Sequence, residues 1–195
     1  MDRDQLEQLL SDVRDGRVDV DAAVAAMRHW PTETTGSARI DHHRALRCGM
    51  PEVIYCPGKR TEQIVEIFQR LAAAKGNVLA SRATAEQFAA VKTAAPAAVY
   101  DSDARMICLR QCEAKTSENE NYIAVLSAGT SDIPVAAEAK CTAEMLDQTV
   151  LTIYDVGVAG IHRLLEHVAT LHGAAAIVVV AGMEGALASV VGGLV

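Results

Sequence analysis

The 195-residue sequence contains no long run of basic residues and no apolar run long enough to cross a membrane. Lys and Arg number 18 against 25 Asp and Glu, and the formal net charge of -7 provides none of the broad positive potential that attracts nucleic acids or anionic lipids. The most apolar stretch, residues 174–181, is far shorter than the roughly 20 residues of a membrane-spanning helix. We therefore expect a small-molecule partner, with no nucleic acid and no membrane.

The sequence also lacks the marks of export. Residues 1–5 are charged and run into an amphipathic pattern, without the apolar core and the small-residue cleavage site of a signal peptide. The five cysteines are an odd number and are scattered, unlike the dense disulfide framework of a small secreted domain. We expect a cytoplasmic protein with reduced thiols.

Half of the residues are hydrophobic, which is enough to bury a core. Leu6, Leu9, Leu10 and Val13 repeat at helical spacing, and the pattern resumes at residues 18–27, which predicts a helical hairpin. After a polar connection at 30–37, short apolar runs alternate with amphipathic ones, which predicts a small α/β domain. Its predicted elements are 53–55, 61–74, 78–80, 84–93, 97–100 and 106–109, with Thr61 as an N-cap and Gly76–Asn77 as a helix stop.

A polar run at 113–121 separates this part from a second alternation, so we place a domain boundary between residues 117 and 118, giving domains 1–117 and 118–195. Strands are predicted at 122–126, 150–154 and 176–180, and helices at 134–146, 160–171 and from 186 onwards. The apolar run at 177–180 is typical of a parallel strand covered on both faces. We expect a doubly wound parallel sheet, with a ligand beyond the strands' carboxyl ends, where loops 127–132, 155–159 and 181–185 converge.

The first of these loops carries Gly129, Thr130, Ser131 and Asp132 between a strand and a helix that begins near Pro134. Unpaired amides at a helix start favour a phosphate, and the two hydroxyls can add hydrogen bonds. Asp132 suits a ribose hydroxyl or a proton. A purely structural interpretation, with Ser131 or Asp132 capping the helix, is equally compatible with the sequence.

The other two loops carry titratable residues between glycines. Asp155 and Gly157 precede His162 and Arg163 in the second loop, where the glycine allows a ligand to approach the backbone closely. Gly182 and Glu184 lie in the third loop, and apolar surroundings would make Glu184 a general acid or base. Structural alternatives remain open: the His-Arg pair as a solvated first turn, and Glu184 at a surface helix start.

The motifs at 129–136, 154–163 and 180–187 resemble the nickel-pincer cofactor biosynthesis family LarB. The resemblance extends into the first half, to residues 41–44, 47, 49–53 and 58–59. The second half is also similar, more distantly, to the aminoimidazole ribonucleotide (AIR) carboxylase family PurE, through Ser131-Asp132 and His162-Arg163. This similarity implies a flavodoxin-like, PurE-like fold that assembles as a homo-oligomer, an octamer.

The LarB resemblance implies carboxylation of the pyridinium ring of nicotinic acid adenine dinucleotide and hydrolysis of its phosphoanhydride. The products would be pyridinium-3,5-biscarboxylic acid mononucleotide and AMP. It implies CO2 or bicarbonate as co-substrate and no covalently bound cofactor; Mg²⁺ is compatible with the hydrolysis. A thiolate adding to the ring would make it electron-rich enough to attack CO2.

Within this scheme Glu184 moves the ring proton, while Ser131, Asp132 and the glycine amides, including those of Gly129, Gly157 and Gly182, hold the ribose-phosphate. Asp155 and His162 would orient the substrate. Residues Arg47, Glu52 and Lys59 would close over it from the first domain.

One departure from the family concerns the chain's end. The family's nucleophilic cysteine would follow Val195, and the apolar residues 190–195 lead towards a further strand, so we expect a truncated sequence. Cys141, within a predicted helix, would only pack.

Three other interpretations compete. A zinc site from Cys48, Cys56, Cys108 and Cys112 with His42 or His43 is disfavoured, because cysteines in strands are usually inert packing. A nucleotide-binding regulatory module without catalysis is the second. An AIR carboxylase of purine biosynthesis is the third. It is disfavoured because that family has a catalytic histidine in the corresponding stretch, whereas no histidine follows Glu184 in this sequence.

Overall fold

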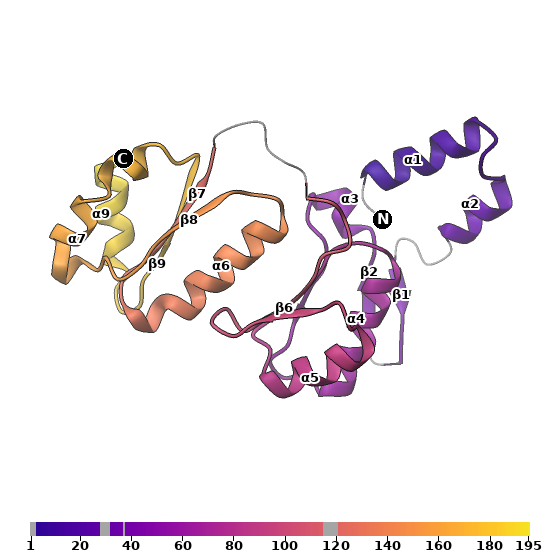
Figure 1. The fold of residues 1–195 in the computed structure, drawn as a ribbon, viewed down its shortest axis with the longest axis horizontal. Coiled ribbons are helices and arrows are strands. Elements are labelled where there is room, and N and C mark those ends of the chain that lie inside the picture. Colours follow the sequence, from indigo (N-terminus) through magenta and orange to yellow (C-terminus); the bar gives the residue numbers. More distant parts are fainter. Residues whose placement is uncertain (1–2, 28–31, 37, 115–120) are drawn as a thin grey trace. The chain divides into compact units, whose positions relative to one another are not determined.

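The structure is a computed structural model that describes residues 3–27, 32–36, 38–114 and 121–195. The chain folds as two compact units, Met1–Val99 with Ile107–Cys112 and Tyr100–Met106 with Glu113–Val195 (Figure 1). The predicted boundary at 117/118 lies outside the described residues, as does part of the predicted connection at 30–37.

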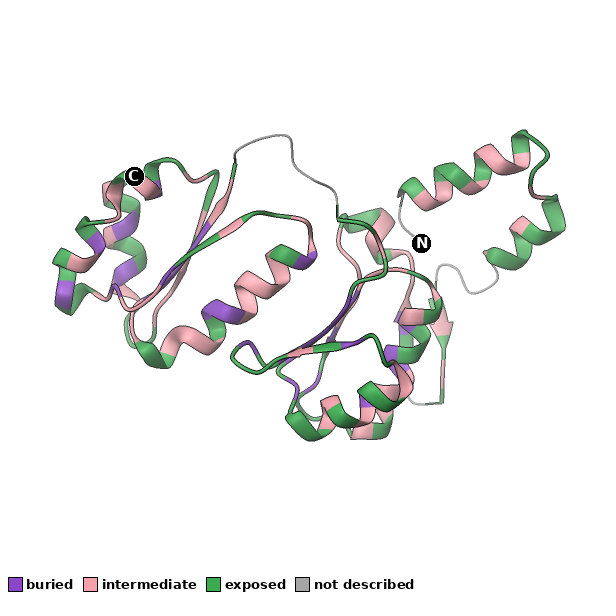
Figure 2. Cartoon of the chain, in the orientation of Figure 1, coloured by how far each residue is buried: buried purple, intermediate pink, exposed green. Residues whose placement is uncertain are grey.

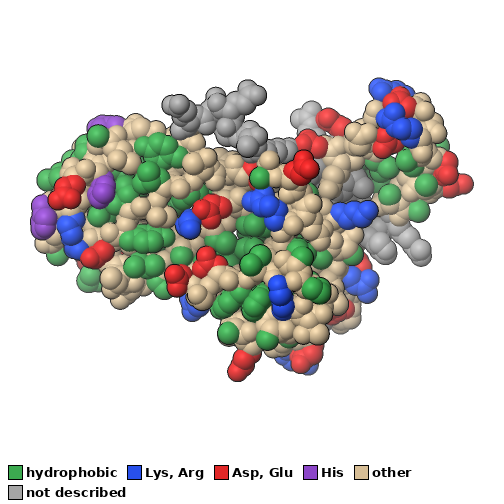
Figure 3. All heavy atoms as spheres, in the orientation of Figure 1, with side chains coloured by type: hydrophobic (Ala, Val, Ile, Leu, Met, Phe, Trp, Pro, Cys, Tyr) green, Lys and Arg blue, Asp and Glu red, His purple; other side chains and the backbone are tan. Residues whose placement is uncertain are grey.

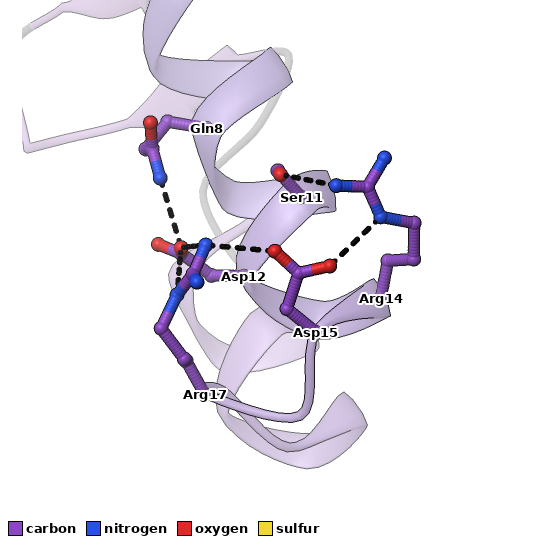
Figure 4. Close-up of polar contacts among 6 residues, drawn as sticks. All are labelled: Gln8, Ser11, Asp12, Arg14, Asp15 and Arg17. Carbon is purple, nitrogen blue, oxygen red and sulfur yellow. Dashed lines mark hydrogen bonds and ion pairs between the residues drawn. The ribbon is translucent and has the colours of Figure 1, made fainter.

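The first unit begins with the predicted helical hairpin, formed by α1 (Arg3–Arg14) and α2 (Val20–Ala26). Asp19 caps α2 by accepting a hydrogen bond from the amide of Ala22 at 2.7 Å. In the turn, the Arg17 guanidinium contacts the carboxylates of Asp12 and Asp15 at 2.8 and 3.0 Å (Figure 4). Charge pairing thus closes a turn that passes through Gly16 at φ +72°.

The small α/β fold predicted after the hairpin is confirmed. A two-stranded antiparallel ribbon precedes a four-stranded sheet with strand order β3-β4-β6-β5, in which β3 and β4 are parallel and β4 and β6 antiparallel. The elements are β1 (Thr32–Thr34), β2 (Arg39–Asp41), α3 (Arg44–Cys48), β3 (Val53–Tyr55), α4 (Thr61–Ala73), β4 (Val78–Ser81), α5 (Ala85–Ala94), β5 (Val99–Asp101) and β6 (Met106–Leu109).

Helix α4 differs at both ends from its prediction. Arg60, not Thr61, is the N-cap residue, and its amide donates to the side chain of Gln63 at 3.0 Å. The helix ends at Ala73 with Ala74 as C-cap, two residues before Gly76, because Lys75 already takes a left-handed conformation at φ +59°. The buried side chains Ile64, Ile67, Phe68 and Leu71 keep helical spacing and face the core of this unit.

The second unit contains a three-stranded parallel sheet with order β8-β7-β9. Because the first strand in sequence is central, this is the flavodoxin-like 2-1-3 order. The elements are β7 (Ile123–Ser127), η1 (Thr130–Asp132), α6 (Ile133–Met145), β8 (Val150–Ile153), η2 (Val158–Gly160), α7 (Ile161–Leu165), α8 (Val168–His172), β9 (Ala176–Val180) and α9 (Ala186–Leu194). The mixed α/β, PurE-like architecture predicted from the sequence is confirmed.

Strand β7 is buried from Ala124 to Ser127, and helices α6, α7 and α9 also carry buried segments, which are purple in Figure 2. A cluster of buried residues surrounds Leu126 and includes Ile153, Leu164 and Leu187. Strand β9, predicted to be covered on both faces, lies at an edge of this sheet, and Val178 is 38% exposed. The apolar run predicted the strand correctly but not the exposure of its residues.

One further prediction in this unit is wrong. The helix expected over 160–171 is divided into α7 and α8, because His167 leaves the helical conformation at φ −105° and ψ 4°. Residues 190–195, expected to lead towards a further strand, lie mostly in α9, which confirms the helix predicted from residue 186 onwards. Leu187 and Val191 are buried one helical turn apart in this helix. Across the described ranges no helix is long and apolar enough to cross a membrane.

Candidate functional site

Three loops meet at the carboxyl edge of the parallel sheet in the second unit. Ser127, the last residue of β7, accepts hydrogen bonds from the amide of Val156 through its carbonyl at 3.0 Å and from the amide of Asp155 through its hydroxyl at 3.2 Å. The next amide, that of Ala128, donates to the carbonyl of Val180 at 2.9 Å. The first loop is therefore tied to the second and the third, as the strand pattern predicted.

Glycines allow the close approach of these loops. A Cβ on Gly157 would lie 2.7 Å from the carbonyl oxygen of Ala128, which is closer than a side chain can approach. A Cβ on Gly182 would lie 3.5 Å from Asp132 Oδ1, so the third loop runs directly beside the carboxylate of the first. Two of the three predicted ligand-binding glycines, Gly157 and Gly182, lie at contacts between loops.

The first loop leaves two amides and two hydroxyls available. The Asp132 carboxylate accepts a hydrogen bond from the amide of Gly129 at 2.9 Å, and the amide of Asp132 donates to the carbonyl of Gly129 at 3.1 Å. Asp132 thus closes the turn before α6, which supports its structural interpretation. The amides and hydroxyls of Thr130 and Ser131 are without hydrogen-bond partners among the described residues, and both side chains are exposed.

The second loop is held by an ion pair. Asp155 is left-handed at φ +59°, and its carboxylate pairs with the guanidinium of Arg163 from α7. The guanidinium lies over Gly160, where a Cβ would be 2.7 Å from Nε. Arg163 is therefore not merely a solvated first-turn residue, whereas His162 is exposed.

The third loop exposes its carboxylate. Met183 is left-handed at φ +54° and fully exposed, and Gly185 follows at φ +68°. Glu184, between them, is also exposed, so the apolar surroundings expected for it are not found. A role for Glu184 as a base therefore requires a bound ligand that excludes water from its carboxylate.

The first-unit residues expected to close over a substrate are bound within their own unit. The Arg47 guanidinium pairs with the Asp41 carboxylate at 2.7 Å, and this hydrogen bond lowers the pKa of Asp41. Glu52 accepts from the amide of Asp41 at 2.6 Å. Lys59 donates to the carbonyl of Tyr55 at 2.6 Å. Each therefore has a local structural role.

The cysteines show no arrangement for metal binding in the part of the chain that the structure describes, where no cluster of three or more His, Cys, Asp or Glu side chains could hold a metal ion. None of the five cysteines forms a disulfide among the described residues. Burial raises the pKa of the Cys56 thiol to about 11, so this thiol is protonated and unreactive at neutral pH. Cys48 is exposed, and Cys141, in α6, is half-buried.

Sequence reasoning missed Ser127 as a site residue. Its side chain is fully buried, and its hydroxyl is the link between β7 and Asp155. The available signal was a polar residue at the end of an otherwise apolar strand.

Comparison with known proteins agrees with this architecture. The profile of the LarB/PurE-like N-terminal domain matches residues 32–111. Uncharacterized protein MJ0165 of Methanocaldococcus jannaschii is 33% identical over 208 aligned residues, which cover 97% of this chain and 77% of that protein. The fold and the profile define a carboxylase-type family of α/β enzymes. Within that class, the chain belongs to the LarB-like family.

Proposed function

We propose that this protein carboxylates the pyridinium ring of nicotinic acid adenine dinucleotide and hydrolyses its phosphoanhydride. The observation that carries the proposal is the meeting of three loops at one sheet edge, with the open amides and hydroxyls of Thr130 and Ser131 close to the Asp132–Gly182 contact. Phosphate and ribose recognition together with a nearby carboxylate are what this reaction requires.

The chemistry consists of two balanced changes. In the first, a ring carbon forms a bond to CO2, loses its C–H bond, and transfers that proton to the Glu184 carboxylate. A thiolate adds to the ring beforehand to supply electron density and leaves with its electron pair afterwards. In the second, water adds across the phosphoanhydride, which gives AMP and the mononucleotide. None of the five cysteines is assigned as the thiolate.

Binding is assigned to the first two loops. The amides and hydroxyls of Thr130 and Ser131 hold the phosphate at the start of α6, a 13-residue helix whose N-terminal end favours an anion. Asp132 exchanges its bond to the Gly129 amide for a ribose hydroxyl. Asp155, His162 and Arg163 orient the substrate from the second loop.

Glu184 acts from the third loop as the proton acceptor. Since it is exposed in the free protein, the bound ring must exclude water from it before its basicity rises. CO2 or bicarbonate is the co-substrate, Mg²⁺ is compatible with the hydrolysis, and the subunits associate as a homo-oligomer, an octamer.

Incubation of the protein with nicotinic acid adenine dinucleotide and ¹³C-bicarbonate tests the proposal. We expect AMP release together with a mononucleotide heavier by one labelled carboxylate, detected by mass spectrometry. Binding of the dinucleotide without AMP or label would favour a regulatory binding module. Label in aminoimidazole ribonucleotide, offered separately, would favour a purine carboxylase; no binding of either compound would refute the assignment of this edge.

A further inference from the structure

The first unit has a carboxyl edge of its own. Strands β3 and β4 are parallel, with Tyr55 opposite Ser81, and each leads into a helix, α4 or α5. The amide of Cys56 donates to the carbonyl of Ser81 at 3.1 Å, which holds the two loops together. Ligands of α/β proteins bind beyond such strand ends.

An aromatic–guanidinium pair lies on this edge. The ring of Tyr55 is beneath the Arg82 guanidinium, 5.6 Å from its centroid, while Tyr55 remains 49% exposed. Arg82 is exposed and left-handed at φ +54°, a conformation that residues with a side chain rarely adopt. The strain is tolerated at the position that sets the guanidinium over the ring.

A second cation is fixed at the same strand end. The Lys59 ammonium donates to the carbonyl of Tyr55 at 2.6 Å, which holds the ammonium beside the backbone of Tyr55. Glu62 and Glu86 occupy the first turns of α4 and α5, so net charge alone does not define an anion site here. An anion site at this edge therefore depends on where the Lys59 ammonium and the Arg82 guanidinium are held.

Ser81 provides an independent indication of a ligand. It is only 7% exposed, and its hydroxyl has no hydrogen-bond partner within the described ranges. Because residues paired in parallel strands project to the same face, this hydroxyl lies on the side of the sheet that carries the Tyr55 ring. Buried polar groups normally have a partner, and this one lacks it.

We propose that this edge binds a nucleoside monophosphate. The base stacks on the flat surface made by Arg82 over Tyr55, as bases do on guanidinium and aromatic planes. The phosphate contacts the Lys59 ammonium, and the Ser81 hydroxyl bonds to the ribose-phosphate. Only the choice of adenine rests on the proposed function, in which AMP is a product.

Calorimetric titration of the full chain with AMP, adenosine and inorganic phosphate tests the inference without any turnover. We expect AMP to bind, and adenosine or inorganic phosphate alone to bind at least about tenfold more weakly. Phosphate alone lacks the stacked base, which contributes about 1–3 kcal/mol, and adenosine lacks the contact with Lys59. Arg82→Ala should weaken AMP binding about tenfold or more and Ser81→Ala by a smaller factor. The matched control Arg105→Ala, which also removes an exposed, left-handed arginine, should leave it unchanged.

Equal weakening by Arg82→Ala and Arg105→Ala would overturn the proposal, as would saturation by phosphate alone. So would AMP binding that is lost in Asp132→Ala but kept in Arg82→Ala, because AMP would then occupy the second unit. Absence of dinucleotide turnover, with AMP binding intact and sensitive to Arg82→Ala, would refute the proposed function and leave this site standing.

Discussion

Glu184 is exposed and lies between two left-handed residues, Met183 and Gly185. A carboxylate in water is a weak base, so its proposed role requires a ligand to cover it. Its chemistry is therefore testable without disturbing the core.

Replacing Glu184 with Gln should leave folding and dinucleotide binding intact and lower the carboxylation rate by about 10²–10⁴-fold, the usual contribution of a general base. Calorimetry measures the binding, and ¹³C incorporation measures the rate. Glu166→Gln removes another exposed carboxylate of the same unit and should change neither. An unchanged rate in Glu184→Gln would remove this residue from the mechanism.

Asp132 has two possible roles, which two substitutions separate. Asp132→Asn keeps an oxygen that can accept from the Gly129 amide, so it should fold like the parent chain yet bind the dinucleotide several-fold more weakly. Asp132→Ala also removes the turn contact and should cost about 1 kcal/mol of stability, as lost helix caps do. Urea unfolding and calorimetry measure the two effects. Parental affinity in Asp132→Asn would show that the carboxylate only closes the turn.

At the scale of elements, the site depends on how closely loops can pack. The second loop reaches the first only because Gly157 has no side chain to meet the Ala128 carbonyl. The fully buried Ser127 then fixes Asp155 through its hydroxyl. Strand β7 positions both neighbouring loops, although it contributes none of the proposed catalytic groups.

Gly157→Ala should therefore displace the second loop and destabilise the second unit by about 1–3 kcal/mol, the range for overpacking a close contact. Dinucleotide affinity should fall with it. Gly193→Ala adds a methyl group where nothing lies within 4 Å and should preserve stability and affinity. Urea unfolding followed by circular dichroism compares them, and equal stability of the two variants would contradict the close approach of the loops.

The sequence predicted elements better than it predicted their ends and contacts. Apolar periodicity located α4, whose buried residues keep helical spacing, and a continuous apolar run located β9. It did not show that helix 160–171 breaks at His167 or that Arg60 caps α4, because both depend on single backbone angles. The sequence likewise did not predict the Asp155–Arg163 ion pair, because this pair requires the left-handed conformation of Asp155.

Considered as a whole molecule, the chain joins two α/β units of different topology, a mixed four-stranded sheet and a parallel three-stranded one. Each unit carries parallel strands whose carboxyl ends lead into helices, and we assign a ligand to each. The global stability of the chain then includes local charge pairs, of which Asp41–Arg47 in the first unit has a defined pH dependence.

The Arg47 hydrogen bond lowers the pKa of Asp41 in the folded chain, so ionised Asp41 stabilises the fold above its unfolded pKa of about 3.9. This contribution is lost as the pH falls through the lower, folded value. Asp41→Asn should cost less than about 1 kcal/mol at neutral pH, as exposed ion pairs do, and nothing at the acid end. Urea unfolding at pH 7 and pH 3 measures it, with Asp103→Asn as a control; a difference that persists or grows in acid would contradict the assignment.

The pairing of Asp155 with Arg163 means that the guanidinium assigned to substrate binding in the second loop already has a counter-ion. An arriving anion would exchange with this internal carboxylate rather than neutralise a bare positive charge. Affinity should then respond weakly to ionic strength, while the displaced Asp155 becomes a hydrogen-bond acceptor for sugar hydroxyls. Binding of the substrate's anionic group would thus free the Asp155 carboxylate to bind the sugar of the same substrate.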